Sequence, residues 1–334
     1  MARRLFISNS RVMKTFAIKL IIIILLIVGI DVVVGAVSDR LVMNMPETSS
    51  YISKTTYSIL KKKTDILILG ASKAKHGYNP FMIEDSLGAD CYNAAEDGCD
   101  MMYYDMMLAG FQSRCNPKIV IIDMAPLALM NQPTIDNGKY LYGLSPIIDS
   151  FYDQNLSLLE RIKLKSNLYR FNGFYGQMAS NLLNKNSANK GFTPLEGTYS
   201  GATYKKDTLF TPSTREIGYM NDVAARCKRK NVRLIMCISP SYHRNPIYNK
   251  YLQQYCKHNN IEFYDMSKDR KFLHPNLFKD KDHLNKDGSK KFTEELISRI
   301  KHCPRNKPLL YKPIDTTLWK PKLIRIIRDV TSLK

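Results

Sequence analysis

The sequence predicts an α/β protein built on a doubly wound parallel sheet. The first observation is a set of short apolar runs in which polar and apolar residues do not alternate, at residues 65–69, 118–123, 232–238 and 261–264, with a shorter run at 90–93. Such runs are buried on both faces, which is typical of parallel strands covered by helices. The second observation is that helical patterns lie between the runs, as a doubly wound fold requires.

The predicted helices have recognisable starting points. Asn79 followed by proline is a helix N-cap with proline at the first helical position. A helix rich in methionine and tyrosine begins after Asp100, and residues 214–230 form the helix that precedes the run at 232–238. The last helix begins after Asn285 and repeats apolar residues along one face.

The N-terminal segment has the features of a membrane anchor. Residues 15–37 are nearly all apolar and are long enough to cross a bilayer. Lysine and arginine precede or open this run, which predicts a basic cytoplasmic tail at 1–19, a transmembrane signal anchor at 20–37, and the rest of the chain outside the cytoplasm, periplasmic or at the cell surface. A cleaved signal peptide is the rival interpretation, because Ala36 and Ser38 form a small-x-small cleavage site.

The rest of the chain divides by composition. Residues 38–63 are expected to form a polar stalk, and 64–303 a compact domain. Residues 130–212 are too long for an ordinary loop and are interpreted as an inserted, partly helical cap near the site. Residues 304–334 form a basic tail with an amphipathic end, which we expect to dock on the membrane or on a membrane partner.

The charge balance and the missing motifs limit the classes of partner and cofactor that we expect for this chain. The chain has 50 Lys and Arg against 30 Asp and Glu, a net charge of +20, which favours an anionic partner or simply a basic solvated surface. The membrane segment argues against nucleic acid as that partner. Walker A, GxGxxG and CxxC signatures and Cys/His clusters with metal-ligand spacing are missing, so we expect no cofactor and no metal. Seven cysteines leave at least one unpaired.

The first candidate site segment is Gly70-Ala71-Ser72, at the end of the first apolar run. In open α/β sheets, sites form outside the carboxyl ends of the strands. At the start of the following turn, backbone N–H groups favour negative charge, so Ser72 is a candidate nucleophile. The alternative is a plain turn, for which a small residue is common.

The second candidate segment precedes the last helix. Asp280 and His283 are three residues apart, so the carboxylate can hold the imidazole that a nucleophilic serine needs as its base. Asp282 is the runner-up, because it adjoins His283 and cannot easily face the same ring. A chance surface pair is the alternative. The other histidines are expected on the surface or in loops, with His243 able to line the cleft; they are His76, His243, His258, His274 and His302.

Together these segments resemble the conserved blocks of the SGNH (GDSL-like) hydrolase superfamily. The first block, a strand ending in Gly-Asp-Ser, is similar to residues 66–72, and the last block, Asp-x-x-His-Leu before a helix, is similar to residues 280–284. A second block, a strand followed by an oxyanion glycine, is similar to residues 92–98. The resemblance covers 64–303 and implies a flavodoxin-like SGNH hydrolase fold.

The resemblance also implies roles for residues. Ser72 would be the nucleophile, His283 the base and Asp280 the carboxylate that orients it. The N–H groups of Ser72 and Gly98 would form the oxyanion hole. Two departures stand out: Ala71 replaces the usual aspartate before the serine, and no asparagine follows the strand at 118–123.

Such departures resemble the divergent membrane-anchored members of the superfamily, among them the D-alanyl transfer protein of teichoic-acid synthesis and the alginate O-acetylation proteins. That resemblance implies a membrane-anchored serine esterase or O-acyltransferase acting on acyl groups of cell-surface polysaccharide. Its partners would be the acylated polysaccharide or acyl donor, the membrane and a membrane-bound O-acyltransferase. The second hypothesis is a non-catalytic SGNH-like subunit of an envelope polysaccharide assembly. The missing asparagine favours it, and the retained serine, histidine and aspartate count against it.

Overall fold

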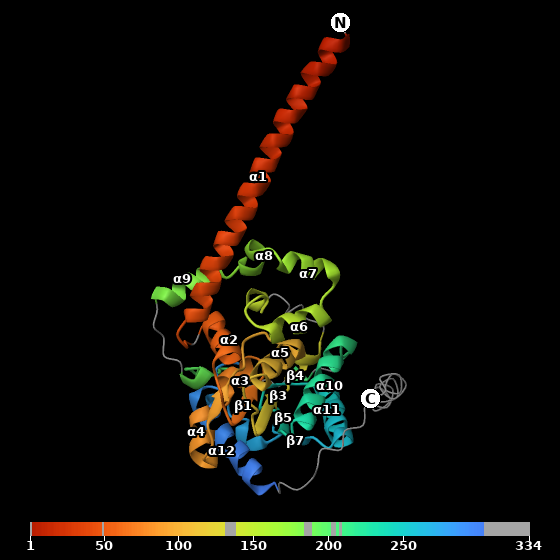
Figure 1. The fold of residues 1–334 in the computed structure, drawn as a ribbon. Helices are drawn as coiled ribbons and strands as arrows, with labels where there is room; N and C mark the ends of the chain where they lie inside the picture. Colours follow the sequence, from red (N-terminus) through yellow and green to blue (C-terminus); the bar gives the residue numbers. More distant parts are fainter. Residues whose placement is uncertain are drawn as a thin grey trace.

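The domain is organised around a parallel sheet of five strands in the described part of the chain (Figure 1). The computed structural model describes residues 2–48, 50–130, 138–183, 189–201, 205–206 and 209–303. The strand order is β2-β1-β3-β5-β7, and every pairing is parallel. This order is the flavodoxin-like one and confirms the predicted doubly wound fold. The strands are β1 (Ile66–Leu69), β2 (Cys91–Asn93), β3 (Ile119–Asp123), β5 (Arg233–Ile238) and β7 (Glu262–Asp265).

The register places alternate residues of each strand in two separate cores. Ile66 pairs with Cys91 on one side and Ile119 on the other. Ile66 and Ile68 face one core, while Leu67 and Leu69 face the other. Both faces of the central strands are buried, which explains why the strand sequences show no polar alternation.

Helices cover each face. On one side are α5 (Met101–Gln112), α10 (Thr214–Arg229) and α11 (Pro246–Asn259). On the other are α3 (Ser72–Gly77), α4 (Pro80–Leu87) and α12 (Lys286–His302). The predicted caps are in place: the side chains of Asn79, Asp100 and Asn285 accept backbone N–H groups at the starts of α4, α5 and α12.

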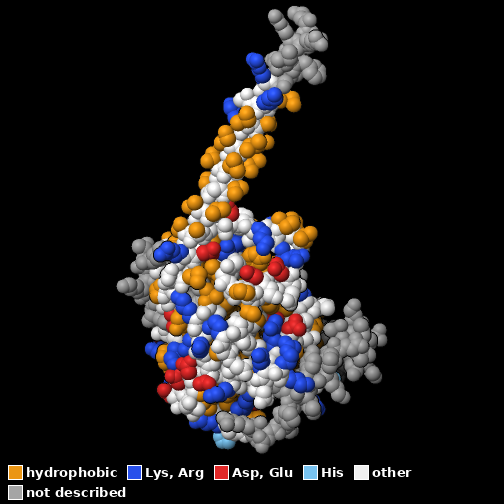
Figure 2. All heavy atoms as spheres, viewed as in Figure 1, with side chains coloured by type: hydrophobic (Ala, Val, Ile, Leu, Met, Phe, Trp, Pro, Cys, Tyr) orange, Lys and Arg blue, Asp and Glu red, His pale blue; other side chains and the backbone are white. Residues whose placement is uncertain are grey.

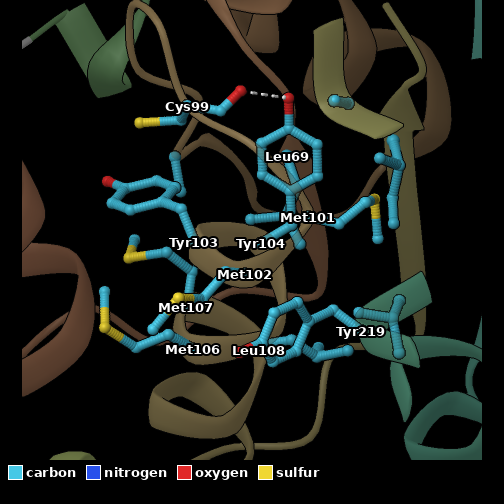
Figure 3. Packing of buried hydrophobic residues seen from close by; sticks show 14 of the residues in the cluster. Leu69, Cys99, Met101, Met102, Tyr103, Tyr104, Met106, Met107, Leu108 and Tyr219 are labelled. Carbon is cyan, nitrogen blue, oxygen red and sulfur yellow. Dashed lines mark hydrogen bonds between the residues drawn. The ribbon is translucent and has the colours of Figure 1, made fainter. Parts of the chain in front are cut away.

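Helix α5 is buried along nearly all of its length. Its residues from Met101 to Phe111 are all buried, because the sheet lies on one side and further helices on the others. Figure 3 shows its methionines and tyrosines in this core, with Leu69 beside Tyr104, whose hydroxyl donates to the carbonyl oxygen of Cys99 at 3.1 Å. A helix apolar on every side suits such a central position.

The N-terminal helix α1 (Ala2–Asn44) projects from the domain (Figure 1). Its stretch from Arg11 to Asn44 has the length and apolar composition of a membrane span, which fits a membrane anchor or a signal sequence. From residue 11 to Ile30 the side chains are exposed, and burial against the domain begins at Asp31. The predicted apolar segment therefore consists of an exposed part up to Ile30 and a part from Asp31 onward that packs on the domain.

The predicted polar stalk at 38–63 is wrong, because most of that segment packs on the domain. It contains the end of α1 and helix α2 (Tyr51–Leu60), and the side chains of Val42, Ile52 and Ile59 join the same core as α5. The polar residues of α2 that suggested a stalk are buried too. The hydroxyl of Thr55, for example, is hydrogen-bonded to that of Tyr103 at 2.9 Å.

Lys54 is the one charged residue of α2. Its side chain is 1% exposed, and its Nζ donates to the carbonyl oxygens of Ala95 and, at 2.8 Å, of Gly191. The carboxylate of Glu96, itself 1% exposed, lies 3.4 Å from the same Nζ. A buried ammonium group is tolerated only with such partners.

The inserted segment between β3 and β5 has two parts. Its helices pack on the α1 side of the domain rather than over the sheet edge: α6 contacts α5, α8 contacts α1, and α9 contacts α2. Residues 189–199 instead run beside α3 and the start of α12. The helices are η3 (Lys139–Leu141), α6 (Pro146–Asn155), α7 (Leu158–Leu164), α8 (Asn167–Phe171) and α9 (Tyr175–Leu183), and η4 (Asn189–Gly191) follows.

Short elements complete the described chain. A small parallel pair joins β4 (Lys205–Lys206) to β6 (His243–Arg244), and the single turns of 3-10 helix are η1 (Pro126–Leu129), η5 (Arg270–Phe272) and η6 (Pro275–Leu277). The predicted basic tail at 304–334 lies outside the described residues.

We expect Lys54→Met to destabilise the full-length protein by about 3 kcal/mol, because it leaves the buried Glu96 carboxylate with one cation fewer. Urea unfolding of the detergent-solubilised chain measures the change. The matched control is Lys118→Met, whose ammonium is 75% exposed beside Asp65 and should change stability by less than about 0.5 kcal/mol. Equal unfolding midpoints for the two variants would contradict the role given to Lys54.

Candidate active site

Ser72 and His283 meet at the carboxyl end of β1. The Nε2 atom of His283 lies 2.8 Å from the Oγ of Ser72. Ser72 is the first residue of α3, and Gly70 makes the turn between strand and helix with a positive φ of 151°. A Cβ on Gly70 would stand 2.5 Å from that of Ala74, so only glycine lets the chain turn this tightly into the helix.

His283 is held by a closed loop just before α12. Phe278 and Leu284 form an antiparallel bridge, and the N–H of Lys279 donates to the carbonyl oxygen of His283 at 2.9 Å. Within this loop the Nδ1 of His283 lies 2.9 Å from both carboxylate oxygens of Asp280. Ser72, His283 and Asp280 therefore stand in one hydrogen-bonded row.

The carboxylate of Asp280 is kept ionised by its surroundings. Burial works to raise its pKa, but hydrogen bonds from the backbone N–H groups of Asp282 (2.8 Å) and His283 (3.0 Å), and from the His283 ring, leave the pKa below its usual value. An ionised Asp280 accepts the Nδ1 hydrogen of His283, which leaves Nε2 free to accept a proton from Ser72.

Packing between α12 and α3 sets the distance between base and nucleophile. The hydroxyls of Ser289 (2.9 Å) and Thr293 (3.3 Å) both donate to the carbonyl oxygen of Gly77, the last residue of α3. At Gly288 a Cβ would lie 1.9 Å from the carbonyl oxygen of Leu277, so this close approach also needs glycine. The glycine after the histidine loop is thus explained by local packing.

Gly98, the predicted oxyanion residue, lies in the loop after β2. It is exposed, it has a positive φ of 68°, and nothing stands within 4 Å of where its Cβ would be. The N–H of Glu96 donates to the carbonyl oxygen of Gly70 at 3.2 Å, which ties this loop to the turn that carries Ser72. The oxyanion role of the Ser72 and Gly98 N–H groups stays a prediction.

A cluster of mostly buried charged side chains holds the Gly98 loop in place. Lys75 on α3 contacts the carboxylates of Glu96 and, at 2.8 Å, Asp97, while Lys54 approaches Glu96 from the other side. Burial lowers the pKa of Lys54. Burial acts in the same direction on Lys75, but the two carboxylates outweigh it and raise its pKa. The loop is therefore fixed by the ion pairs that the two lysines make with Glu96 and Asp97.

His76 is a site residue that sequence reasoning missed, because its carboxylate partner lies in a different segment. It was expected on the surface, yet its side chain is only 12% exposed. Its Nδ1 lies 2.6 Å from the carbonyl oxygen of Thr193, which can only accept, so Nδ1 carries a hydrogen. Its Nε2 lies 3.3 Å from Asp97, and its ring stands edge-on to that of His283 with centroids 5.9 Å apart.

The end of β3, after which the resemblance implies an asparagine, is buried. β3 ends at Asp123, whose side chain is 1% exposed. Burial raises the pKa of this carboxyl, and the nearby positive charge of Lys73 offsets the rise only in part. Asp123 thus belongs to the interior beneath the site, and the structure assigns it no part in the row formed by Ser72, His283 and Asp280.

Asp282 and His243 lie next to the site but outside that row. An Asp282 oxygen stands 3.2 Å from the Ser241 hydroxyl and 3.7 Å from the Nδ1 of His243. The N–H of Tyr242 donates to the carbonyl oxygen of Lys281 at 2.8 Å, so the segment after β5 is joined to the histidine loop. His258, His274 and His302 are exposed, as predicted.

Metal chemistry finds no support among the described residues, which contain no group of three His, Cys, Asp or Glu that could hold an ion. All seven cysteines lie in the described part of the chain, and none forms a disulfide there. Five of them are buried, where they act as packing residues.

Asp280→Asn should lower the rate of Ser72 chemistry by about four orders of magnitude, because an amide in this place stabilises the wrong histidine tautomer. Asp282→Asn is the matched control and should leave the rate within a few fold, since its contacts are with Ser241 and His243. The second-order rate of covalent labelling by a fluorophosphonate measures both. A larger loss for Asp282→Asn would refute the assignment.

Comparisons with known proteins add little to this geometry. Neither the models of protein families nor the curated proteins contain a match to the chain. Among solved structures it is similar to a predicted acylhydrolase from Bacteroides fragilis, with 13% identity and a TM-score of 0.39 over 75% of this chain and 97% of that one. A likeness this low carries no argument about activity. The fold is shown by the sheet itself, a doubly wound parallel α/β sheet of flavodoxin-like order.

Proposed function

We propose that this chain is a membrane-anchored serine esterase or O-acyltransferase of the SGNH type. The observation that carries the proposal is the row from Asp280 through His283 to Ser72, with 2.9 Å and 2.8 Å between the interacting atoms. A serine hydroxyl becomes a useful nucleophile only when a base is in position to take its proton. The row supplies that base together with the carboxylate that orients it.

The chemistry follows from these positions. The Ser72 oxygen attacks an ester carbonyl while its proton passes to the Nε2 of His283, and the charged oxygen of the tetrahedral intermediate lies against the N–H groups of Ser72 and Gly98. Collapse breaks the ester bond, and His283 returns the proton to the leaving alcohol. The acyl group is then bound to Ser72. A second alcohol or water, deprotonated by His283, removes it by the same steps in reverse.

The acceptor decides between the two activities. Water makes the protein an esterase, and a sugar hydroxyl makes it an O-acyltransferase. We propose cell-surface polysaccharide as the partner in both cases. It carries the ester that an esterase would cleave, or it supplies the hydroxyl to which a transferase would pass an acyl group delivered by a membrane-bound O-acyltransferase. The support is the combination of an anchor-like α1 with the Ser72–His283 pair on one chain. The net charge of +20 suits an anionic polymer.

The second candidate function is a non-catalytic subunit of an envelope polysaccharide assembly. The observation that favours it is that β3 ends at the buried Asp123 and no asparagine follows it, so the oxyanion donor that the resemblance implies there is missing. Losing one such donor costs about two to three orders of magnitude in rate. The intact row of Ser72, His283 and Asp280 counts against a scaffold, which needs none of its hydrogen bonds.

Ser72→Ala should abolish covalent labelling by a fluorophosphonate and any esterase activity, because it removes the attacking oxygen while the fold stays intact. Ser298→Ala is the control, since Ser298 is exposed on α12, away from the hydrogen-bonded row and from the contacts with α3, and should keep labelling. Mass spectrometry of the labelled peptide locates the adduct. Absence of labelling in the unmodified full-length chain would favour the non-catalytic alternative.

Protease added to intact spheroplasts should digest the domain, because the basic residues that precede the apolar run keep the N-terminus in the cytoplasm. A tag at the N-terminus should remain protected until the membrane is permeabilised. Full protection of the domain would overturn the proposed topology.

A further inference from the structure

The outward face of α7 and α8 carries an unusual group of exposed apolar side chains. On α7, Leu158, Leu159 and Ile162 are 66%, 62% and 59% exposed, and Leu168 on α8 is 39% exposed. Both helices lie at the base of α1 (Figure 1). In the space-filling view, apolar side chains cover the projecting helix and appear again on the domain surface beside its base (Figure 2).

Helix α8 is fixed to α1 by three α1 residues on one helical face. The carboxylate of Asp31 accepts the N–H groups of Asn167 and Leu168 and the hydroxyl of Ser166, and so caps the start of α8. One turn on, Gly35 leaves room for Asn167, whose side chain would lie 2.3 Å from a Cβ there. A further turn on, Asp39 pairs with Arg170 at 2.7 Å. The spacing of four residues keeps all three on the same face.

This attachment fixes the level of α7 and α8 along the anchor. The apolar run of α1 at residues 15–37 is about 34 Å long, slightly more than the thickness of a bilayer hydrocarbon core, and its outer end carries the residues that hold α8. The domain begins to cover α1 at Asp31, while Val32, Val33 and Val37 on the opposite side stay 54–63% exposed. The level at which α8 is held is therefore the level at which α1 leaves the hydrocarbon.

We propose that the α7–α8 face docks into the lipid–water interface of the membrane that α1 enters. Its apolar side chains would sit among the upper acyl groups, continuous with the apolar surface of α1. Arg161, Lys163 and Lys165 on the same segment have long stems that can bring their charges to lipid phosphates. Apolar residues interleaved with basic ones are typical of helices that lie in the plane of a membrane surface.

The inference rests on the proposed membrane anchoring and adds a second point of attachment. With α1 alone, the helix and the domain attached to it could tilt in the membrane. With α7 and α8 also in the interface, the tilt is restrained, and so is the height of the Ser72 edge of the sheet above the bilayer.

Tryptophan fluorescence in vesicles tests the proposal on the full-length chain. The only natural tryptophan, Trp319, is replaced by phenylalanine, and Leu159→Trp introduces a single reporter on α7. The matched control is Phe81→Trp in the same background. Phe81 is 42% exposed on α4, at the end of the domain away from α1 (Figure 1). Both proteins are reconstituted in vesicles that contain phosphatidylglycerol, with or without lipids brominated on their acyl chains.

We expect brominated lipid to remove most of the emission of the tryptophan at 159, with a blue-shifted spectrum, and to leave the one at 81 unchanged. Flotation of the vesicles reports separately whether α1 anchors the chain. Failure to float overturns the anchoring and this inference with it. A chain that floats but whose reporter at 159 is neither quenched nor shifted overturns the inference alone and assigns the face to a protein partner.

Discussion

The buried ammonium group of Lys54 is the contact on which the arrangement of the site depends. It comes from α2, the helix that follows α1, yet its partners are the carbonyl oxygens of Ala95 and Gly191 and the carboxylate of Glu96. These groups belong to the loop that carries Gly98 and to the insertion that borders α3. A buried ammonium group needs all of these partners to offset its loss of hydration, so the three segments are held together as one unit.

The other half of the site depends on how closely α12 approaches α3. The two hydroxyls that share the Gly77 carbonyl oxygen, and the glycine at 288, allow the histidine loop to lie against the nucleophile turn. A shift of either helix would lengthen the Ser72–His283 distance, and proton transfer requires that distance to stay within hydrogen-bond reach. Secondary structure alone would not place these side chains together.

The sheet was predictable from the sequence because its central strands are buried on both faces and so appear as uninterrupted apolar runs. Ser72 and the Asp280–His283 pair were predictable because a strand end and a helix start mark them. The burial of α2 was not, because its threonines and Lys54 look solvated until their distant partners are known. His76 was missed for the same reason, since Asp97 approaches it only in the folded chain.

The cap that Asp31 provides for α8 places the true start of the folded domain inside the apolar helix. A version of the protein cut after the apolar run would keep the sheet and the Ser72 turn, but the N-terminus of α8 would lose the carboxylate of Asp31. Asp39, the partner of Arg170, would then lie almost at the cut end of the chain. One that begins at residue 64 would also lack Lys54. A water-soluble form should therefore begin just before Asp31, with its exposed valines replaced by polar residues.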